Sequence, residues 1–502
     1  MWLKAYLDLI ERRPTWAFIA NALINQIILP EVTSMEQVNT FLQMWDVPTQ
    51  GPRAHNLPKY LLRMLQTAKK YHINFAALKL SKELKSQMPV WHHLGLTPNH
   101  YKKQKNKCLL ENHAIPTIVD MVKLARRTEN PTYSERRHHP RSTCACNPCK
   151  DDKRRGCPNP NKCSRMAHKI LKGLHPKFDP KITPVDDGLT LTHQRTEKNN
   201  TNRAQKKGEI LFDPSVTLQT ELVDGFRIFT DPTKISPNPA HRLVNTRRGI
   251  SVDEEAITAF TDGSCIINGK ANAQSGAGIW ISEGHPKNQA IKIANMSHSN
   301  QSGELVAVLA TLIDAPNYAL VQIQTDSRFV IDGLTKHLKD WEDRGWLGMH
   351  YKELFKATAY QLQLQLATTS FVWIKGHSGD MGNKRADALA RKGATKQNYN
   401  EIDLTVPPEF DLQGAKLATI TQTMAYQGVL KEKHKKHTDQ KTTMMRLDIT
   451  QYAIERINGN LEADQSIWHS CQSKDISLTI RQFIFKALHD THHIGQYWDH
   501  IP

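Results

Sequence analysis

The sequence has no long hydrophobic run. Its most apolar stretch, Trp16 to Pro30, is too short and too polar to span a bilayer. The first residues are typical of an amphipathic helix and not of a secretory signal. Cysteine is also scarce, with 8 in 502 residues, which argues against a disulfide framework and for a reducing compartment. We therefore expect a protein of the nucleus or cytoplasm that has no membrane partner.

Acidic residues are also fewer than basic ones. The chain has 49 Asp and Glu against 67 Lys and Arg, which gives a formal net charge of +18. The excess is uneven. Residues 257–394 are nearly neutral, with 14 basic residues against 12 acidic, whereas residues 102–172 hold 18 against 6. Such an excess attracts phosphate backbones non-specifically and in a salt-dependent way, although a solvated basic linker has the same composition. The imbalance favours nucleic acid as a partner of the second segment.

The length allows two to four domains. Apolar residues recur at helical spacing near the N-terminus, and composition changes several times along the chain. We expect five regions, which are a helical region 1–130, a basic Cys-rich segment 131–173, a linker 174–255, an α/β domain 256–395 and a mainly helical region 396–502.

Four carboxylates in the α/β region suggest a metal site. We expect strands that end at Asp262 and Asp326, a helix with Glu304 in its first turn, and a later helix that carries Asp387. Four carboxylates in one pocket repel and raise one another's pKa unless cations neutralise them. Oxygen-only ligands suit Mg²⁺ or Mn²⁺. Two such ions about 3.5–4 Å apart clamp the attacking and leaving oxygens of a phosphodiester.

Five short motifs in this region resemble type 1 ribonuclease H. TDGS at Asp262, SNQSGEL at Glu304, TDS at Asp326, WIKGHSGDMGN at His377 and RADALA at Asp387 stand in the order of that family. The resemblance covers less than a third of the chain. It implies an α/β ribonuclease H-like fold, with a five-stranded mixed sheet flanked by helices, embedded between mainly helical regions. It also implies hydrolysis of the RNA strand of an RNA–DNA hybrid with two Mg²⁺ or Mn²⁺ ions.

The family's catalytic roles fall on matching positions of this sequence. The four acids would be catalytic metal ligands, and His377, on a glycine-flanked loop, would assist proton transfer or product departure. Positions that would contact the substrate are Gly263, Ser264, Asn300, Gln301, Ser327, Trp341 and Trp346.

Two pairs among these positions have distinct implied roles. Asn300 and Gln301 would read the 2′-hydroxyls that distinguish RNA from DNA. Trp341 and Trp346 would pack on the DNA strand, although two tryptophans at this spacing suit core packing equally well.

Five of the eight cysteines gather in the basic segment, at Cys144, Cys146, Cys149, Cys157 and Cys163. Thiolates two to five residues apart, with Pro and Gly between them, suit tetrahedral Zn²⁺. The spacing matches no standard zinc finger, and His168 is a further candidate ligand. Five thiols for four positions leave one spare. The alternative is a set of free thiols in a flexible basic loop.

The layout of the chain resembles the C-terminal portion of a fungal retrotransposon (reverse transcriptase) polyprotein. A helical region, a basic Cys cluster and the ribonuclease H-like region precede a tail that ends at Pro502, before the Cys and His ligands expected of a zinc-binding tail, so we expect a truncated tail. We predict an endoribonuclease for RNA–DNA hybrids. A catalytically inactive nucleic-acid-binding module and a recombinase of related fold are the alternatives.

Overall fold

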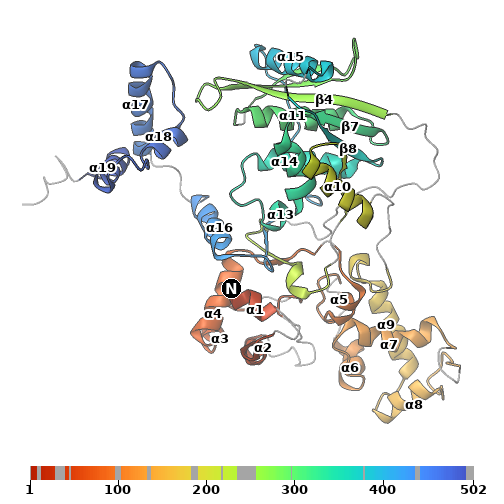
Figure 1. Ribbon diagram of the computed structural model, residues 1–502. Coiled ribbons are helices and arrows are strands. Elements are labelled where there is room, and N and C mark those ends of the chain that lie inside the picture. The colour runs from red at the N-terminus through yellow and green to blue at the C-terminus, as the bar shows by residue number, and fades with distance from the viewer. Residues whose placement is uncertain are drawn as a thin grey trace, which may run out of the picture.

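The computed structural model describes most of the chain. The described residues are 2–7, 13–28, 40–44, 47–77, 79–96, 103–132, 137–182, 190–215, 219–234, 256–294, 297–376, 379–435 and 441–492. Among them, two large hydrophobic cores dominate, one around a mixed sheet and one among the N-terminal helices. A small third core lies between the C-terminal helices (Figure 1). Within the described residues, no helix is long and apolar enough to cross a membrane.

A six-stranded sheet, in the order β2-β8-β7-β4-β5-β6, forms the centre of the first core. Its strands are β2 (Glu209–Leu211), β4 (Ala256–Ile266), β5 (Gln274–Trp280), β6 (Gln289–Lys292), β7 (Leu320–Thr325) and β8 (Thr369–Trp373). β4 pairs in parallel with β7, and β7 with β8, whereas β5 and β6 are antiparallel. The mixed sheet expected from the sequence is confirmed, and β2 adds a sixth strand to the expected five.

Helices cover both faces of the sheet (Figure 1). The helices α11 (Asn300–Asp314) and α14 (Lys352–Leu364) lie on one face of the sheet, and α15 (Met381–Thr395) lies on the other. A glycine lets α15 approach closely, because a Cβ at Gly278 would stand 2.0 Å from the Ala386 carbonyl oxygen. This close approach places α15, which carries Asp387, beside the strands that carry the other acids.

The segment expected to be a linker is partly built into the sheet, so that expectation is wrong for its central part. It holds α10 (His193–Gln205) and β2, which pairs antiparallel with β8. The Asn199 amide group donates to the Leu211 carbonyl oxygen (2.9 Å), and its oxygen accepts from the Leu211 N–H (3.0 Å). α10 thus joins β2 through polar side chains, which explains why apolar periodicity did not predict it.

The second core is helical, as expected for residues 1–130, and helices continue into the Cys-rich segment, where none was predicted. They are α1 (Trp2–Leu7), α2 (Thr15–Ile27), α3 (Pro52–His55), α4 (Lys59–Lys70), α5 (Lys82–Gln87), α6 (Lys103–Glu111), α7 (Ile118–Glu129), α8 (Asn147–Arg154) and α9 (Pro160–Lys172). A small sheet of β1 (Asn74–Phe75), β3 (Phe226–Ile228) and β9 (Ala415–Lys416) ties three distant parts of the chain to this core.

In the described residues after β9 there are four helices. They are α16 (Gln422–His434), α17 (Lys441–Asn458), α18 (Asp464–Ser470) and α19 (Leu478–Leu488). Met424 of α16 belongs to the N-terminal core, whereas α17, α18 and α19 share the small third core. The C-terminal region is therefore helical, as expected, but it divides between two cores.

Candidate active site

Asp262 lies within a strand and not at its end, contrary to the expectation from the sequence. β4 continues through Asp262 to Ile266, and Asp262 pairs with Gly278 of β5. The glycine after it is required by packing, because a Cβ at Gly263 would stand 2.3 Å from the Glu304 backbone nitrogen. The strand therefore passes directly under the start of α11, and this contact brings Asp262 and Glu304 together.

Local structure positions the next two acids. Ser299 and Ser302 form a capping box that starts α11, and Glu304 follows in a buried part of its first turns. Asp326 comes directly after β7. Carboxylate oxygens of Asp262, Glu304 and Asp326 all lie within 4.8 Å of one another. Three acids from two strands and a helix thus form one cluster.

The cluster carries unfavourable electrostatics. Burial, reinforced by the charges of Asp326 and Asp387, raises the pKa of Asp262 to about 6. Burial and the charge of Asp262 raise the pKa of Glu304 well above its usual range. The compensating donors are few: the Gly263 N–H donates to Asp262 (2.8 Å), and the Thr325 hydroxyl approaches Glu304 at 3.4 Å. Divalent cations would remove this repulsion.

Asp387 belongs to the same cavity but not to the close cluster. Its two oxygens accept from Arg391 one helical turn later, at 3.0 Å from Nε and 2.9 Å from Nη2. Asp387 and Arg391 are four residues apart and lie on the same face of α15, which explains the pairing. The structure therefore brings three of the four expected acids together and places the fourth at the wall of the cavity.

The acids open into a polar cavity of about 460 Å³. Its wall is formed by Asp262, Gly263, Ser264, Cys265, Asn300, Glu304, Asp326, Gly379, Asp380, Asn383, Lys384, Asp387 and Arg391. Of the expected substrate-binding residues, Gly263, Ser264 and Asn300 line it. Gln301 and Ser327 lie next to this wall in sequence without forming part of it. Sequence reasoning missed Lys384 and Arg391, although the Asp–Arg spacing of one helical turn was readable.

The Trp341 to Trp346 segment packs inside the protein. Trp346 is only 5% exposed and packs in the core, and the expected contact with a DNA strand stays a prediction. Trp341 is half-buried, and its ring lies 4.8 Å from that of Phe355 and 5.6 Å from that of His337, between centroids. Core packing, which the sequence left open, describes both tryptophans better.

The same segment joins the two large cores. A Cβ at Gly345 would stand 2.6 Å from the backbone nitrogen of Ala415 in β9. Buried Arg227 of β3 bonds to Asp343 (Nη1 to Oδ1, 3.4 Å) and, through Nε, to the Gln413 carbonyl oxygen (3.0 Å). A family position expected to face nucleic acid is thus occupied by contacts within the chain.

His377 and Ser378 lie outside the described residues. The catalytic role expected for His377 therefore stays a prediction. Its neighbour Gly376 borders the acids, because a Cβ there would stand 2.6 Å from Asp326 Oδ2.

The cysteines form two groups, so the expectation of one five-cysteine cluster is wrong. Cys144, Cys146 and Cys149 surround His138, and Cys157 and Cys163 meet Cys108 and His113. His168, the candidate ligand from the sequence, instead pairs with Glu129 (Nδ1 to Oε1, 3.0 Å). The missed ligands left one weak signal, the spacing of four residues between Cys108 and His113. That pair stands too far from the other cysteines in sequence to be connected with them.

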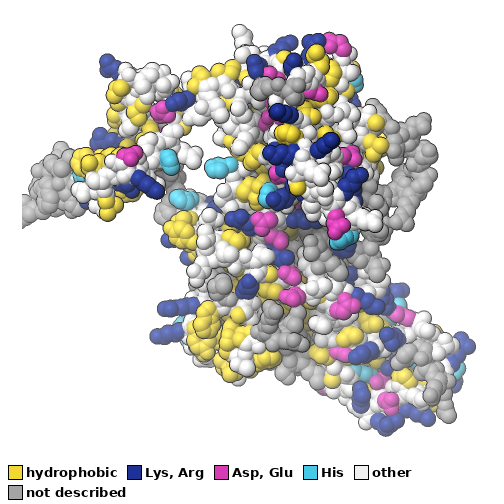
Figure 2. Space-filling view, viewed as in Figure 1, with side chains coloured by type: hydrophobic (Ala, Val, Ile, Leu, Met, Phe, Trp, Pro, Cys, Tyr) yellow, Lys and Arg dark blue, Asp and Glu magenta, His cyan; other side chains and the backbone are white. Residues whose placement is uncertain are grey.

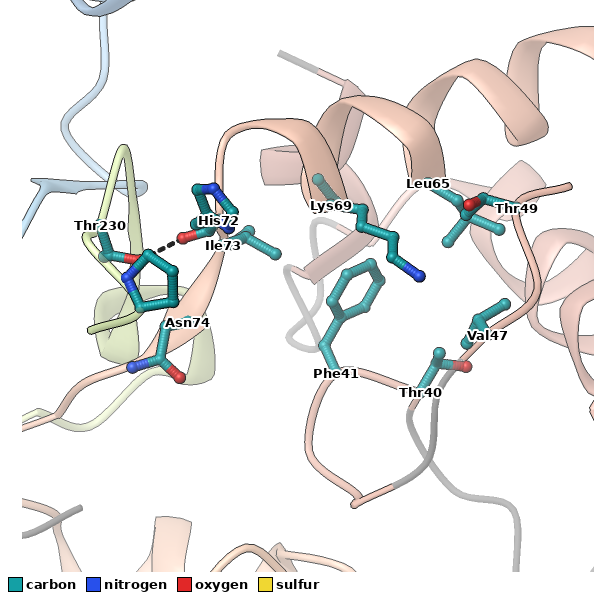
Figure 3. Close-up of a pocket in the computed structure, with 12 residues that line it drawn as sticks. Thr40, Phe41, Val47, Thr49, Leu65, Lys69, His72, Ile73, Asn74 and Thr230 are labelled. Atoms are coloured by element: carbon teal, nitrogen blue, oxygen red, sulfur yellow. Dashed lines mark hydrogen bonds between the residues drawn. The ribbon is translucent and has the colours of Figure 1, made fainter. Parts of the chain in front are cut away.

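A second cavity, of about 340 Å³, lies in the N-terminal core (Figure 3). Phe41, Val47 and Leu65 give it apolar walls, and Lys69 and His72 are among its polar groups. None of the residues described as lining it is acidic or a thiol. It therefore offers no set of groups for metal-dependent hydrolysis, and the acid cavity is the better candidate for the active site.

Comparisons with known proteins agree with this choice. The family model described as RNase H matches residues 254–395. The chain is 35% identical to Ribonuclease H of Methylobacillus flagellatus over 158 residues, which are 30% of this chain and 99% of that protein. It is 34% identical to Ribonuclease H of Hyphomonas neptunium, over 28% of this chain and 93% of that protein.

Longer relatives match over a smaller part of their length. The chain is 32% identical to Ribonuclease H1 of Mus musculus over 170 residues, which are 32% of this chain and 59% of that protein. The chain thus spans little more than half the length of this relative.

Proposed function

Because the chain belongs to the ribonuclease H family, we propose that it is an endoribonuclease that hydrolyses the RNA strand of RNA–DNA hybrids. The observation that carries this proposal is the cluster of Asp262, Glu304 and Asp326, whose oxygens lie within 4.8 Å of one another in an open polar cavity. Carboxylates whose pKa values are raised together at a surface cavity are typical of a metal-dependent catalytic site.

The donor set fits Mg²⁺ or Mn²⁺, because it consists of carboxylate oxygens. Asp262, Glu304 and Asp326 would hold the ions, and Asp387 would join them when it leaves Arg391. Bound ions would supply an activated water and charge stabilisation at the phosphate. Asp262 is on β4, Glu304 on α11 and Asp326 directly after β7, so regular elements position the ligands for the ions.

The other groups of the cavity suit a nucleic acid strand. Asn300 lies at the start of α11, where its amide can bond to a 2′-hydroxyl. Lys384 and Arg391 supply positive charge at the opposite wall, on α15. Phosphate oxygens are the natural partners of such side chains.

A second nucleic-acid contact is proposed at the basic Cys-rich segment. Figure 2 shows Lys and Arg side chains over the region that contains α8 and α9. Lys150, Arg155 and Lys162 are exposed there. This surface would hold nucleic acid while the acids cleave it. The retrotransposon origin stays a prediction, because the family model covers residues 254–395 and the matched relative is a ribonuclease H.

Incubating the full chain with end-labelled RNA–DNA hybrid, duplex DNA and duplex RNA, with and without Mg²⁺, tests the proposal. Mg²⁺-dependent cutting of the RNA strand of the hybrid alone is expected. Retention of the hybrid without cutting would favour a binding module, and joining of DNA strands would favour a recombinase. Either result would overturn the proposed activity.

A further inference from the structure

We propose that the N-terminal region contains two separate structural zinc sites, each built from three thiolates and one imidazole. The first site is formed by His138, Cys144, Cys146 and Cys149, and the second by Cys108, His113, Cys157 and Cys163. In each group the ligand atoms all lie within 4.8 Å of one another. Together they use six of the eight cysteines, all except Cys265 and Cys471.

The first site has the dimensions of a tetrahedral zinc centre. The Nδ1 atom of His138 lies 3.5 Å from the sulfur of Cys144, 3.6 Å from that of Cys146 and 3.4 Å from that of Cys149. With Zn–S and Zn–N bonds of usual length, a tetrahedron has a sulfur-to-nitrogen edge of about 3.5 Å. All four residues are buried. A closed, buried set of four ligands is typical of a structural site and not of a catalytic one.

The second site has matching geometry. The sulfurs of Cys157 and Cys163 lie 3.6 Å apart, close to the edge of about 3.8 Å expected between two zinc-bound thiolates. His113 points Nδ1 at Asp152 Oδ1 (3.3 Å), and its Nε2 is buried without a hydrogen-bond partner. A zinc-binding histidine commonly donates a hydrogen bond from its other ring nitrogen to a carboxylate. The free Nε2 is therefore the atom available to the metal.

One ion pair connects the two sites. Arg127 lies 2.7 Å from Asp152 (Nη1 to Oδ2) and donates to the sulfur of Cys149 (3.3 Å). Both side chains are buried, at 5% and 6% exposure. Three thiolates and Zn²⁺ leave one negative charge at the first site, and the guanidinium of Arg127 offsets it. Asp152 orients His113 of the second site, so the pair supports one ligand of each.

The ligands also explain the fold of this segment. Cys108 is on α6 and Cys163 on α9, so the second metal would fasten these two helices, and the first would fasten α8, which carries Cys149, to the segment before it. Cys144, Cys146 and Cys149 form a core cluster of their own, separate from the main N-terminal core. Metal bonds are the usual substitute where a small region cannot bury enough apolar area.

Metal analysis of the purified full chain tests the proposal. Two zinc ions per chain are expected, one in Cys149→Ser, one in Cys163→Ser and none in the double variant. Cys471→Ser is the matched control, because this half-exposed cysteine lies outside both groups, and it should keep two. One zinc per chain, no zinc, or iron with the visible absorption of an iron–sulfur cluster would overturn the proposal. This readout is independent of any hybrid cleavage.

A second pair of variants covers the case in which a cysteine variant fails to fold. Asp152→Asn removes the carboxylate that orients His113, and a chelator should extract one of the two zinc ions about 10–100-fold faster. Asp151→Asn, on the exposed side of the same helix, should release zinc at the wild-type rate. Equal rates in both variants would contradict the assignment of His113 to a zinc site oriented by Asp152.

Discussion

The acid cavity and the thiol groups are two different solutions to binding a divalent cation. The acids present hard oxygen ligands in an open cavity, where the pKa of Asp262 is raised to about 6 by burial and neighbouring charge. The thiols and imidazoles are soft ligands, buried and closed around a tetrahedral volume. An open site with uncompensated charge suits exchangeable ions and substrate, whereas a closed site suits permanent metal. The first region would therefore do chemistry and the second would hold the fold.

The largest expected effect separates the two regions by activity. Asp326→Asn removes one ligand charge from the acid cluster and should lower hybrid cleavage about 1,000-fold or more, since a metal contributes several kcal/mol to the transition state. The zinc content should not change. Asp448→Asn, an exposed acid on α17, is the control and should cleave normally. Wild-type rates in Asp326→Asn would remove the two-metal account.

The next effect concerns stability and pH in buffer free of magnesium and manganese. The raised pKa of Asp262 means that its ionisation in the folded protein opposes folding. The free energy of unfolding should therefore fall as the pH rises from about 4, where an unfolded Asp ionises, through the folded pKa of about 6. The loss is complete above that range and absent below it.

Asp262→Asn removes this penalty and should be more stable than wild type at pH 7 by about 1–3 kcal/mol. Thermal unfolding at pH 5 and pH 7 measures the difference, which should shrink at the lower pH. Added Mg²⁺ should stabilise the wild type and leave the variant nearly unchanged. A variant less stable than wild type at pH 7 would show that the ionised Asp262 does not destabilise the folded protein.

A smaller effect is expected at the basic surface. Replacing Lys150, Arg155 and Lys162 by Gln should weaken binding of duplex nucleic acid about tenfold at low salt and reduce the salt dependence of binding. Cleavage of a short hybrid at saturating concentration should persist. The matched control replaces three exposed lysines of the C-terminal region, Lys441, Lys474 and Lys486. Equal weakening by both triple variants would assign the effect to net charge alone.

The smallest effect sharpens the role of Asp387. Arg391→Gln frees this carboxylate and removes a positive charge from the cavity wall, so half-maximal cleavage should need about threefold less Mg²⁺, a change of under 1 kcal/mol. Cleavage rates recorded over a range of Mg²⁺ concentrations give the half-maximal concentration for each protein. A higher Mg²⁺ requirement would mean that Arg391 supports the site instead of competing with the ions.

The sequence predicted the ribonuclease H region well because its signals are local. The strand and helix that carry Asp326 and Glu304 follow from apolar periodicity and a polar cap. The pairing of Asp387 with Arg391 and the burial of Trp346 could not be predicted, because both depend on neighbours brought by the fold. Asp262 was placed at a strand end because glycine usually stops a strand, whereas here Gly263 serves close packing on α11.

The sequence predicted less outside that region. Cysteine spacing found the thiols but not their division, because Cys108 and His113 reach the second group only through the packing of α6 against α9. The expected linker contains β2, whose three residues are too few for a periodic signal. Contacts between residues distant in the chain thus account for most of the differences.

Crystals of the full chain grown with Mn²⁺, with anomalous scattering recorded at the manganese and zinc absorption edges, test the contrast between the two regions most directly. Manganese is expected between Asp262, Glu304 and Asp326, and one zinc is expected in each thiol group. Manganese away from the acids, or zinc among them with the thiol groups empty, would contradict this contrast.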